Sequence, residues 1–85
     1  MEIVLSGQAQ KHIEHWKKTK NIKIQERIIE LKNAIILNPF QGIGNPEPLK
    51  HELFGKWSRR IDKVNRFVYH IEDNKLHIFS LKGHY

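Results

Sequence analysis

The chain has 85 residues, enough for one hydrophobic core and too few for two, so we expect a single domain over residues 1–85. It has no cysteine, which excludes disulfide bonds and thiolate metal sites, and no apolar run approaches a membrane span or secretion signal, so we expect a cytoplasmic protein. Fifteen Lys and Arg residues against nine Asp and Glu give a formal charge of +6, which favours polyanionic partners.

The first half of the chain predicts a short strand and two helices. Residues 2–5 form the strand, which stops at Ser6, and Ser6 can cap a first helix. Asn21 can cap a second, longer helix, and this helix should end near Leu37 because Pro39 disfavours helical geometry in the residue before it. Apolar residues at helical spacing give each helix a core-facing stripe: Ala9, Ile13 and Trp16 in the first, Ile24, Ile28, Leu31 and Ile35 in the second.

The second half predicts an antiparallel sheet. Residues 41–48 contain two glycines and two prolines and are expected to be a loop. Strands are expected at about 57–62, 66–72 and 76–82, with a further short strand near 49–53. The order β-α-α-β-β-β, or β-α-α-β-β-β-β with that extra strand, predicts an α+β two-layer sandwich. Both helices then cover one face of a mainly antiparallel sheet and leave the other face open.

The register of the last hairpin decides which residues share the open face. A two-residue loop would pair Glu72 with Lys75 and spread apolar residues over both faces, whereas a three-residue loop, 73–75, pairs Glu72 with Leu76. Because burial selects the register that gathers the apolar residues, the sequence predicts the three-residue loop. The core face would then carry Phe67, Tyr69, Ile71, His77, Phe79 and Leu81. The open face would carry Arg66, Val68, His70, Ile78, Ser80, Lys82 and His84.

Basic residues concentrate on the strands of this predicted sheet. Five of them fall within eleven residues, interleaved with aromatic side chains: Lys56, Arg59, Arg60, Lys63 and Arg66, with Trp57, Phe67 and Tyr69. This interleaving is typical of nucleic-acid binding, although excess lysine also serves solubility.

Three residues could together cleave RNA without a metal ion. This chemistry requires a general base, a group that stabilises the negative charge of the phosphorane, and a general acid. Glu47 is the candidate base, because Pro46 and Pro48 restrict its backbone; a plain loop glutamate is the alternative. Arg66 offers a planar fork of donors for phosphate, or is an exposed strand arginine. His84 can exchange a proton near neutral pH, or is a surface histidine on a frayed tail.

No metal-binding set is apparent from the spacing of the six histidines. His12 and His15 form the only close pair, at i and i+3 of the first helix, and no carboxylates cluster with them. The spacing therefore favours surface histidines over a zinc site.

Four segments together resemble the YoeB-type toxins of the RelE/ParE toxin–antitoxin superfamily. The resemblance rests on the stretches NPEPLKH (45–51), GKWSRRI (55–61), NRFVY (65–69) and the terminal GHY (83–85), and it covers nearly the whole chain. It implies the RelE-like fold. It also implies a toxin that cleaves mRNA in the ribosomal A site and so inhibits translation, without a cofactor.

The same resemblance assigns roles and partners. It makes Glu47 the general base, Arg66 the stabiliser of the transition state, His84 the general acid and Tyr85 a residue that places the substrate. Further basic positions near the site would bind substrate: Lys50, Arg59 and Arg60. The implied partners are mRNA, ribosomal RNA and a YefM-like antitoxin, with a homodimer as a further option. Gly83 departs from the family pattern, which has tyrosine in a YHY ending.

Two other classes of function stay open at this stage. One is a ParE-like inhibitor of DNA gyrase, although such relatives lack the glutamate, arginine and histidine set. The other is a catalytically inert module that binds RNA or the ribosome through the same basic residues.

Overall fold

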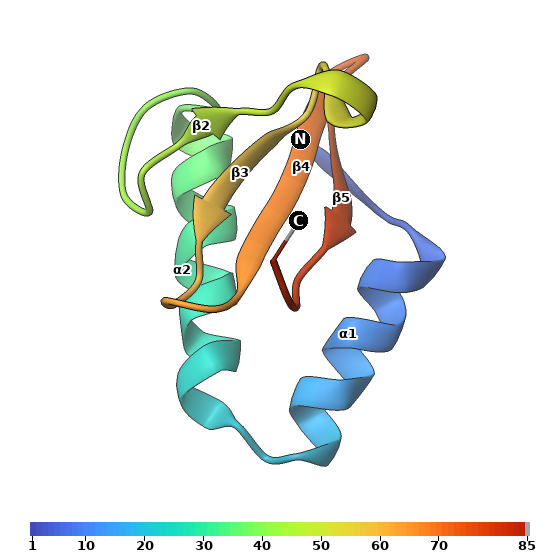
Figure 1. Ribbon diagram of the computed structural model, residues 1–85, viewed down its shortest axis with the longest axis vertical. Coiled ribbons are helices and arrows are strands. Elements are labelled where there is room, and N and C mark those ends of the chain that lie inside the picture. The colour runs from blue at the N-terminus through green and yellow to red at the C-terminus, as the bar shows by residue number, and fades with distance from the viewer. Residues whose placement is uncertain (85) are drawn as a thin grey trace.

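The computed structural model describes residues 1–84. Its elements are β1 (Glu2–Leu5), α1 (Gly7–Lys18), α2 (Ile22–Leu37), β2 (Glu47–Pro48), a 3-10 helix (His51–Leu53), β3 (Trp57–Arg60), β4 (Arg66–Glu72) and β5 (Lys75–Ser80). Within these residues the strands form one sheet in the order β1-β5-β4-β3-β2 (Figure 1). The first pair, β1 and β5, is parallel and the other neighbouring pairs are antiparallel, which confirms the mainly antiparallel α+β fold.

Local sequence signals set the ends of both helices. The Ser6 hydroxyl accepts a hydrogen bond from the Ala9 amide at 3.0 Å, and the Asn21 side chain accepts one from the Ile24 amide at 3.1 Å. Each cap satisfies an amide that has no partner inside its helix. The second helix ends at Leu37, two residues before Pro39. The predicted caps and the predicted end of α2 are confirmed.

The hydrophobic core lies between the two helices and one face of the sheet. The helices contribute Ala9, Trp16, Ile24, Leu31 and Ile35; the sheet and the segments next to it contribute Ile61, Phe67, Tyr69, Leu76, Ile78 and Leu81. Figure 1 shows both helices on the same side of the sheet. The opposite side, here called the open face, has no α-helix packed against it in the described residues. No helix in this part of the chain is long and apolar enough to cross a membrane.

The prediction of a three-residue hairpin loop is wrong. Glu72 pairs with Lys75, and the two turn residues, Asp73 and Asn74, have φ of 53° and 58°. Positive φ at both central residues is the geometry of a type I′ turn, whose twist matches that of the flanking strands.

A β-bulge reconciles this tight turn with burial. Tyr69 pairs with Ile78, but Val68 pairs with Ser80, so β5 has one extra residue, Phe79, at this point. On the far side of the bulge from the turn, even-numbered residues of the two strands are paired as predicted, for example Val68 with Ser80. Between the bulge and the turn, even-numbered residues of β4 are paired with odd-numbered residues of β5. Consequently Ile78 is buried in the core, and His77 lies opposite His70, contrary to the predicted faces.

The polypeptide between α2 and β3 also differs from the prediction. The short extra strand is Glu47–Pro48, inside the predicted loop, where it pairs with β3. Residues 51–53 form a 3-10 helix, and His51 at its start has a φ of 57°, which a strand does not tolerate. Between this strand and the 3-10 helix, the Leu49 amide donates a hydrogen bond to the Lys56 carbonyl at 2.9 Å.

Candidate active site

The strand pairings bring residues from three parts of the sequence onto the open face. Directly opposed residues of neighbouring strands point to the same side of a sheet. One row across the sheet consists of Glu47, Ser58, Val68 and Ser80. The adjacent row pairs Arg60 with Arg66. Glu47 and Arg66 therefore share the open face, although 19 positions separate them in the sequence.

The side chain of Arg66 is oriented by the turn that precedes it. Its Nη1 donates to the carbonyl of Asp62 at 2.8 Å and to that of Asn65 at 3.2 Å, and the side chain is partly exposed. Within the part of the chain that the structure describes, Nε and Nη2 make no hydrogen bond. The guanidinium is thus held at one nitrogen and can offer the remaining donors to an anion.

Asn65 links this turn to the carboxyl-terminal segment. Its side-chain oxygen accepts a hydrogen bond from the Gly83 amide at 2.8 Å, and its own side-chain amide donates to the Asp62 carboxylate. The Gly83 carbonyl in turn accepts from the Arg66 amide at 3.0 Å. Asn65 is buried, and these bonds fix the backbone immediately before His84. Sequence reasoning missed Asn65, although the Asp-x-x-Asn spacing is a signal for such a turn.

The carboxylate of Asp62 is stabilised in its ionised form. Burial acts to raise its pKa, but hydrogen bonds from the Asn65 and Val64 amides, the Asn65 side chain and the charge of Arg66 outweigh burial and lower the pKa. The backbone amides of Asn65 and Val64 donate hydrogen bonds to Asp62 Oδ1 at 2.6 Å and 2.8 Å, respectively. The turn that orients Arg66 is therefore itself held by a charge-assisted network.

His84 is one of the residues that line a hollow of about 400 Å³ on the open face. Its lining includes the apolar side chains of Leu53, Val68 and Phe79 and the lysines Lys56 and Lys82. The ammonium of Lys56 lies 4.5 Å from the centre of the Phe79 ring. Apolar and aromatic surface beside lysine ammonium groups suits a flat base attached to a phosphate. Tyr85 lies outside the described residues.

Glu47 lines a second, adjacent hollow of about 290 Å³. Lys50 and His51 line it as well, and Leu53 belongs to both hollows. Glu47 and Lys50 are exposed to solvent, so both can reach a ligand that crosses from one hollow to the other.

The prediction that Arg59 binds substrate is wrong, because its side chain is fully buried. The guanidinium donates to the carbonyls of Asn38, Gln41 and Ile43, and its Nε lies 3.2 Å from the Tyr69 hydroxyl. That hydroxyl donates to the Pro39 carbonyl at 2.6 Å. Burial raises the pKa of Tyr69, which keeps this hydroxyl protonated as a donor. Arg59 therefore holds the loop after α2 onto the sheet. Its neighbour Arg60 is exposed on the open face.

His12 has a structural partner in the segment that leads to His84. Its Nδ1 accepts a hydrogen bond from the Leu81 amide at 3.0 Å, which requires an unprotonated Nδ1. Burial, followed by the positive charges of Lys82 and His15, lowers the pKa of His12. The neutral imidazole thus anchors the end of β5 to α1.

Comparison with known proteins places the whole chain in one group. A family model described as "YoeB-like toxin of bacterial type II toxin-antitoxin system" matches residues 5–85. Toxin YoeB of Streptomyces coelicolor is 40% identical over 85 residues, which cover 100% of both chains.

Solved structures agree in fold over the full length. A YoeB/ParE toxin from Agrobacterium tumefaciens has a TM-score of 0.96 at 34% identity and covers 100% of both chains. The toxin in a YoeB–YefM complex from Staphylococcus aureus has a TM-score of 0.91 at 40% identity, covering 100% of this chain and 98% of that one. A YoeB dimer from the same organism also scores 0.91, at 38% identity, with the same coverage.

Proposed function

The chain belongs to the YoeB-like toxins of bacterial type II toxin–antitoxin systems, and on that premise we propose that it is a ribosome-dependent endoribonuclease that cleaves mRNA in the A site. Cleavage there would stop translation. The observation that carries the proposal is the arrangement of Glu47, Arg66 and His84: the sheet register puts Glu47 and Arg66 on the open face, and His84 lines the hollow on that face.

The proposed reaction is an acid–base transesterification by the protein's own side chains. Glu47 removes the proton of a ribose 2′-hydroxyl, and the 2′-oxygen attacks the adjacent phosphorus. Arg66 donates to the phosphorane oxygens through its remaining guanidinium nitrogens, and His84 protonates the departing 5′-oxygen. The products are a 2′,3′-cyclic phosphate and a 5′-hydroxyl end.

The surroundings of these residues support an RNA substrate. The hollow beside His84 joins apolar and aromatic surface to the cations Lys56 and Lys82, which suits a nucleobase and its phosphate. Lys50 and Arg60 add exposed positive charge beside Glu47 and Arg66, respectively. We propose that these four residues contact mRNA or ribosomal RNA, with Tyr85 as a further substrate contact.

Two protein partners follow from the relatives. The S. aureus relative is described in a complex with YefM and as a dimer. We propose that a YefM-like antitoxin binds this chain across the open face and blocks the cleavage residues, and that the chain also forms a homodimer. A ribosomal target would place the protein in the cytoplasm.

Mapping of 5′ ends in a purified translation reaction tests the function. Added protein should create new mRNA ends with 5′-hydroxyls at ribosome-occupied codons, and His84→Ala should abolish them. Intact mRNA together with gyrase-dependent DNA breaks would instead indicate a gyrase inhibitor. Tight ribosome binding without new ends would indicate an inert RNA-binding module.

A modified substrate tests the role of His84 separately. A bridging 5′-sulfur is a leaving group that needs little protonation, so His84→Ala should slow cleavage of such an RNA far less than cleavage of ordinary RNA. Equal losses on both substrates would show that His84 positions RNA and does not donate the proton.

A further inference from the structure

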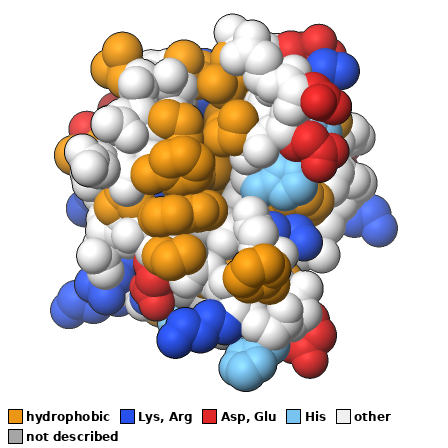
Figure 2. Space-filling view, turned by 90° about the horizontal axis from the view of Figure 1, so that it is seen from above, with side chains coloured by type: hydrophobic (Ala, Val, Ile, Leu, Met, Phe, Trp, Pro, Cys, Tyr) orange, Lys and Arg blue, Asp and Glu red, His pale blue; other side chains and the backbone are white. Residues whose placement is uncertain are grey.

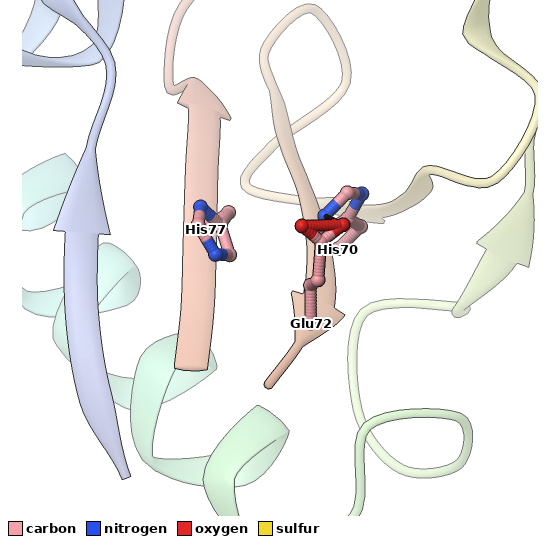
Figure 3. Close-up of side chains that lie close together, drawn as sticks. All are labelled: His70, Glu72 and His77. Carbon is pink, nitrogen blue, oxygen red and sulfur yellow. Dashed lines mark ion pairs between the residues drawn. The ribbon is translucent and has the colours of Figure 1, made fainter. Parts of the chain in front are cut away.

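Two histidines and a glutamate meet on the open face near the turn of the β4–β5 hairpin. His70 and Glu72 come from β4 and His77 from β5, and Figure 3 shows the three side chains gathered over these strands. One potential ligand atom from each residue lies within 4.8 Å of the other two. This group, the hairpin cluster, involves none of the residues assigned to cleavage.

The hairpin register explains why these side chains converge. His70 and His77 are directly opposed across the two strands, and Glu72 lies two residues beyond His70, so all three point to the same side of the sheet. The two imidazole rings meet edge to face with centroids 5.2 Å apart. The Nε2 of His70 lies 3.5 Å from a carboxylate oxygen of Glu72.

These separations are close to those of a bound transition-metal ion. Bonds of about 2.0–2.2 Å place tetrahedral ligand atoms about 3.3–3.6 Å apart. The His70–Glu72 distance already has this value, and small rotations about the side-chain torsions of His77 and Glu72 would bring the other pairs from within 4.8 Å to the same range. The side chains of His70 and Glu72 are 26% and 60% exposed, so an ion can enter from solvent.

We propose that the hairpin cluster binds one divalent transition-metal ion, with zinc as the best match. Two imidazoles and one carboxylate form a donor set that suits zinc, whereas magnesium and calcium prefer oxygen ligands alone. A water molecule would complete the tetrahedron on the solvent side.

Neighbouring residues shape the site and limit its affinity. The Phe79 ring packs against His70 with centroids 5.4 Å apart and forms an apolar wall on that side. Lys75 lies opposite Glu72, and the Lys56 ammonium lies 4.5 Å from the centre of the Phe79 ring. These two positive charges oppose a cation, so we expect weaker binding than at a closed structural zinc site.

The ion would link β4 to β5 without taking part in cleavage. His70 and Arg66 are four residues apart in β4, which corresponds to about 13 Å along the strand. At that distance the ion cannot touch the phosphate held by Arg66. Its effect would be on the hairpin, because an ion that binds only the folded chain stabilises the fold by mass action.

Calorimetric titration of the metal-free, full-length protein with zinc chloride tests the proposal. The expected result is one ion per chain, with shifts of the His70 and His77 ring signals in NMR spectra. At a zinc concentration roughly a hundred times the Kd, the Tm should rise by about 15 °C. Loss of a direct ligand in His77→Gln or Glu72→Gln should weaken binding by about 100-fold or more, because changes of residues that only support a ligand already cost roughly 10–100-fold.

The matched control is His15→Gln, which removes a histidine from α1 and should leave zinc binding unchanged. Circular dichroism of each metal-free variant confirms that it is folded. Wild-type affinity in His77→Gln would overturn the proposal, as would NMR shifts confined to histidines outside the hairpin cluster. The absence of any binding by wild type would overturn it too.

Discussion

Arg59 and Arg60 are adjacent in β3 yet have opposite surroundings, because successive side chains of a strand point to opposite faces of the sheet. Arg59 is enclosed and donates to backbone carbonyls of the loop after α2, whereas Arg60 faces solvent. The loop is shaped to the guanidinium: a Cβ added at Gly42 would lie 3.1 Å from Arg59 Nη1. Of these two adjacent arginines, Arg59 therefore has a structural role, and Arg60 is free to bind a partner.

Replacing each arginine by lysine should separate these roles. Lysine cannot reproduce the fork, so Arg59→Lys leaves part-buried carbonyls without donors and should lower the free energy of unfolding by about 2–4 kcal/mol. Arg60→Lys, the matched control, should change it by less than about 0.5 kcal/mol. Urea unfolding of both variants measures the difference. Equal destabilisation would contradict the structural role of Arg59.

Replacing Glu47 by glutamine should isolate the proposed base. The change keeps size and hydrogen bonding but removes basicity, so single-turnover cleavage on ribosomes should slow by roughly 10²–10⁴-fold. Glu52→Gln makes the same chemical change at an exposed glutamate in the 3-10 helix and should leave the rate unchanged. A normal rate in Glu47→Gln, with ribosome binding intact, would assign the base to another group.

At the scale of secondary-structure elements, the predictions that succeed depend on neighbours in sequence. The caps Ser6 and Asn21 act on amides three residues ahead, and Pro39 acts on the residue before it. Such signals do not require knowledge of the fold. They account for the starts of both helices and for the end of α2. The strand bounds are less well predicted, because β3 ends at Arg60 and not at residue 62, and β5 spans Lys75–Ser80 and not 76–82.

The predictions that fail depend on contacts between distant segments. The bulge at Phe79 exists because it lets Ile78 and Leu81 both reach the core beside a two-residue turn, and alternation alone does not reveal it. The register error placed His77 in the core and so hid its pairing with His70. Similarly, the carbonyls that hold Arg59 lie 16 to 21 positions away in sequence, at Ile43, Gln41 and Asn38. The candidate site was identified from motifs, whereas its geometry required the sheet.

The contact between α1 and the end of β5 should make stability depend on pH. The pKa of His12 is lowered from its ordinary value of 6.5, so below that value the unfolded chain binds more protons than the folded one. The stabilisation is complete above the unfolded pKa and is lost as pH falls through the lowered folded pKa. Between about pH 7.5 and pH 5, His12→Gln should flatten the resulting fall in the free energy of unfolding.

Denaturant unfolding at a series of pH values measures this effect. His51→Gln removes an exposed histidine from the 3-10 helix and should keep the pH profile of the wild type. If His12→Gln has the same pH slope as the wild type, the bond between His12 and Leu81 is not the source of the dependence.

For the molecule as a whole, the net charge of +6 promotes binding only through those basic side chains that face the partner. Arg59 contributes nothing to an encounter surface because its charge is buried among carbonyls. Arg60 is exposed on the open face and Lys82 is exposed beside the hollow on that face, whereas Lys18 and Lys23 are exposed on the helices. The two pairs carry the same charge in different places, which provides a direct test of how the protein is oriented on the ribosome.

The affinity for ribosomes should fall steeply with salt, because each neutralised phosphate releases condensed counterions. Replacing Arg60 and Lys82 by alanine should reduce the slope of log affinity against log salt by about 1.5, since each contact contributes roughly 0.7–0.9. Replacing Lys18 and Lys23 lowers the net charge equally but should leave that slope near the wild-type value. Binding of fluorescently labelled protein to purified ribosomes at several salt concentrations gives the slopes. If both double variants lose the same slope, net charge alone drives the association, and the open face is not the surface that meets ribosomal RNA.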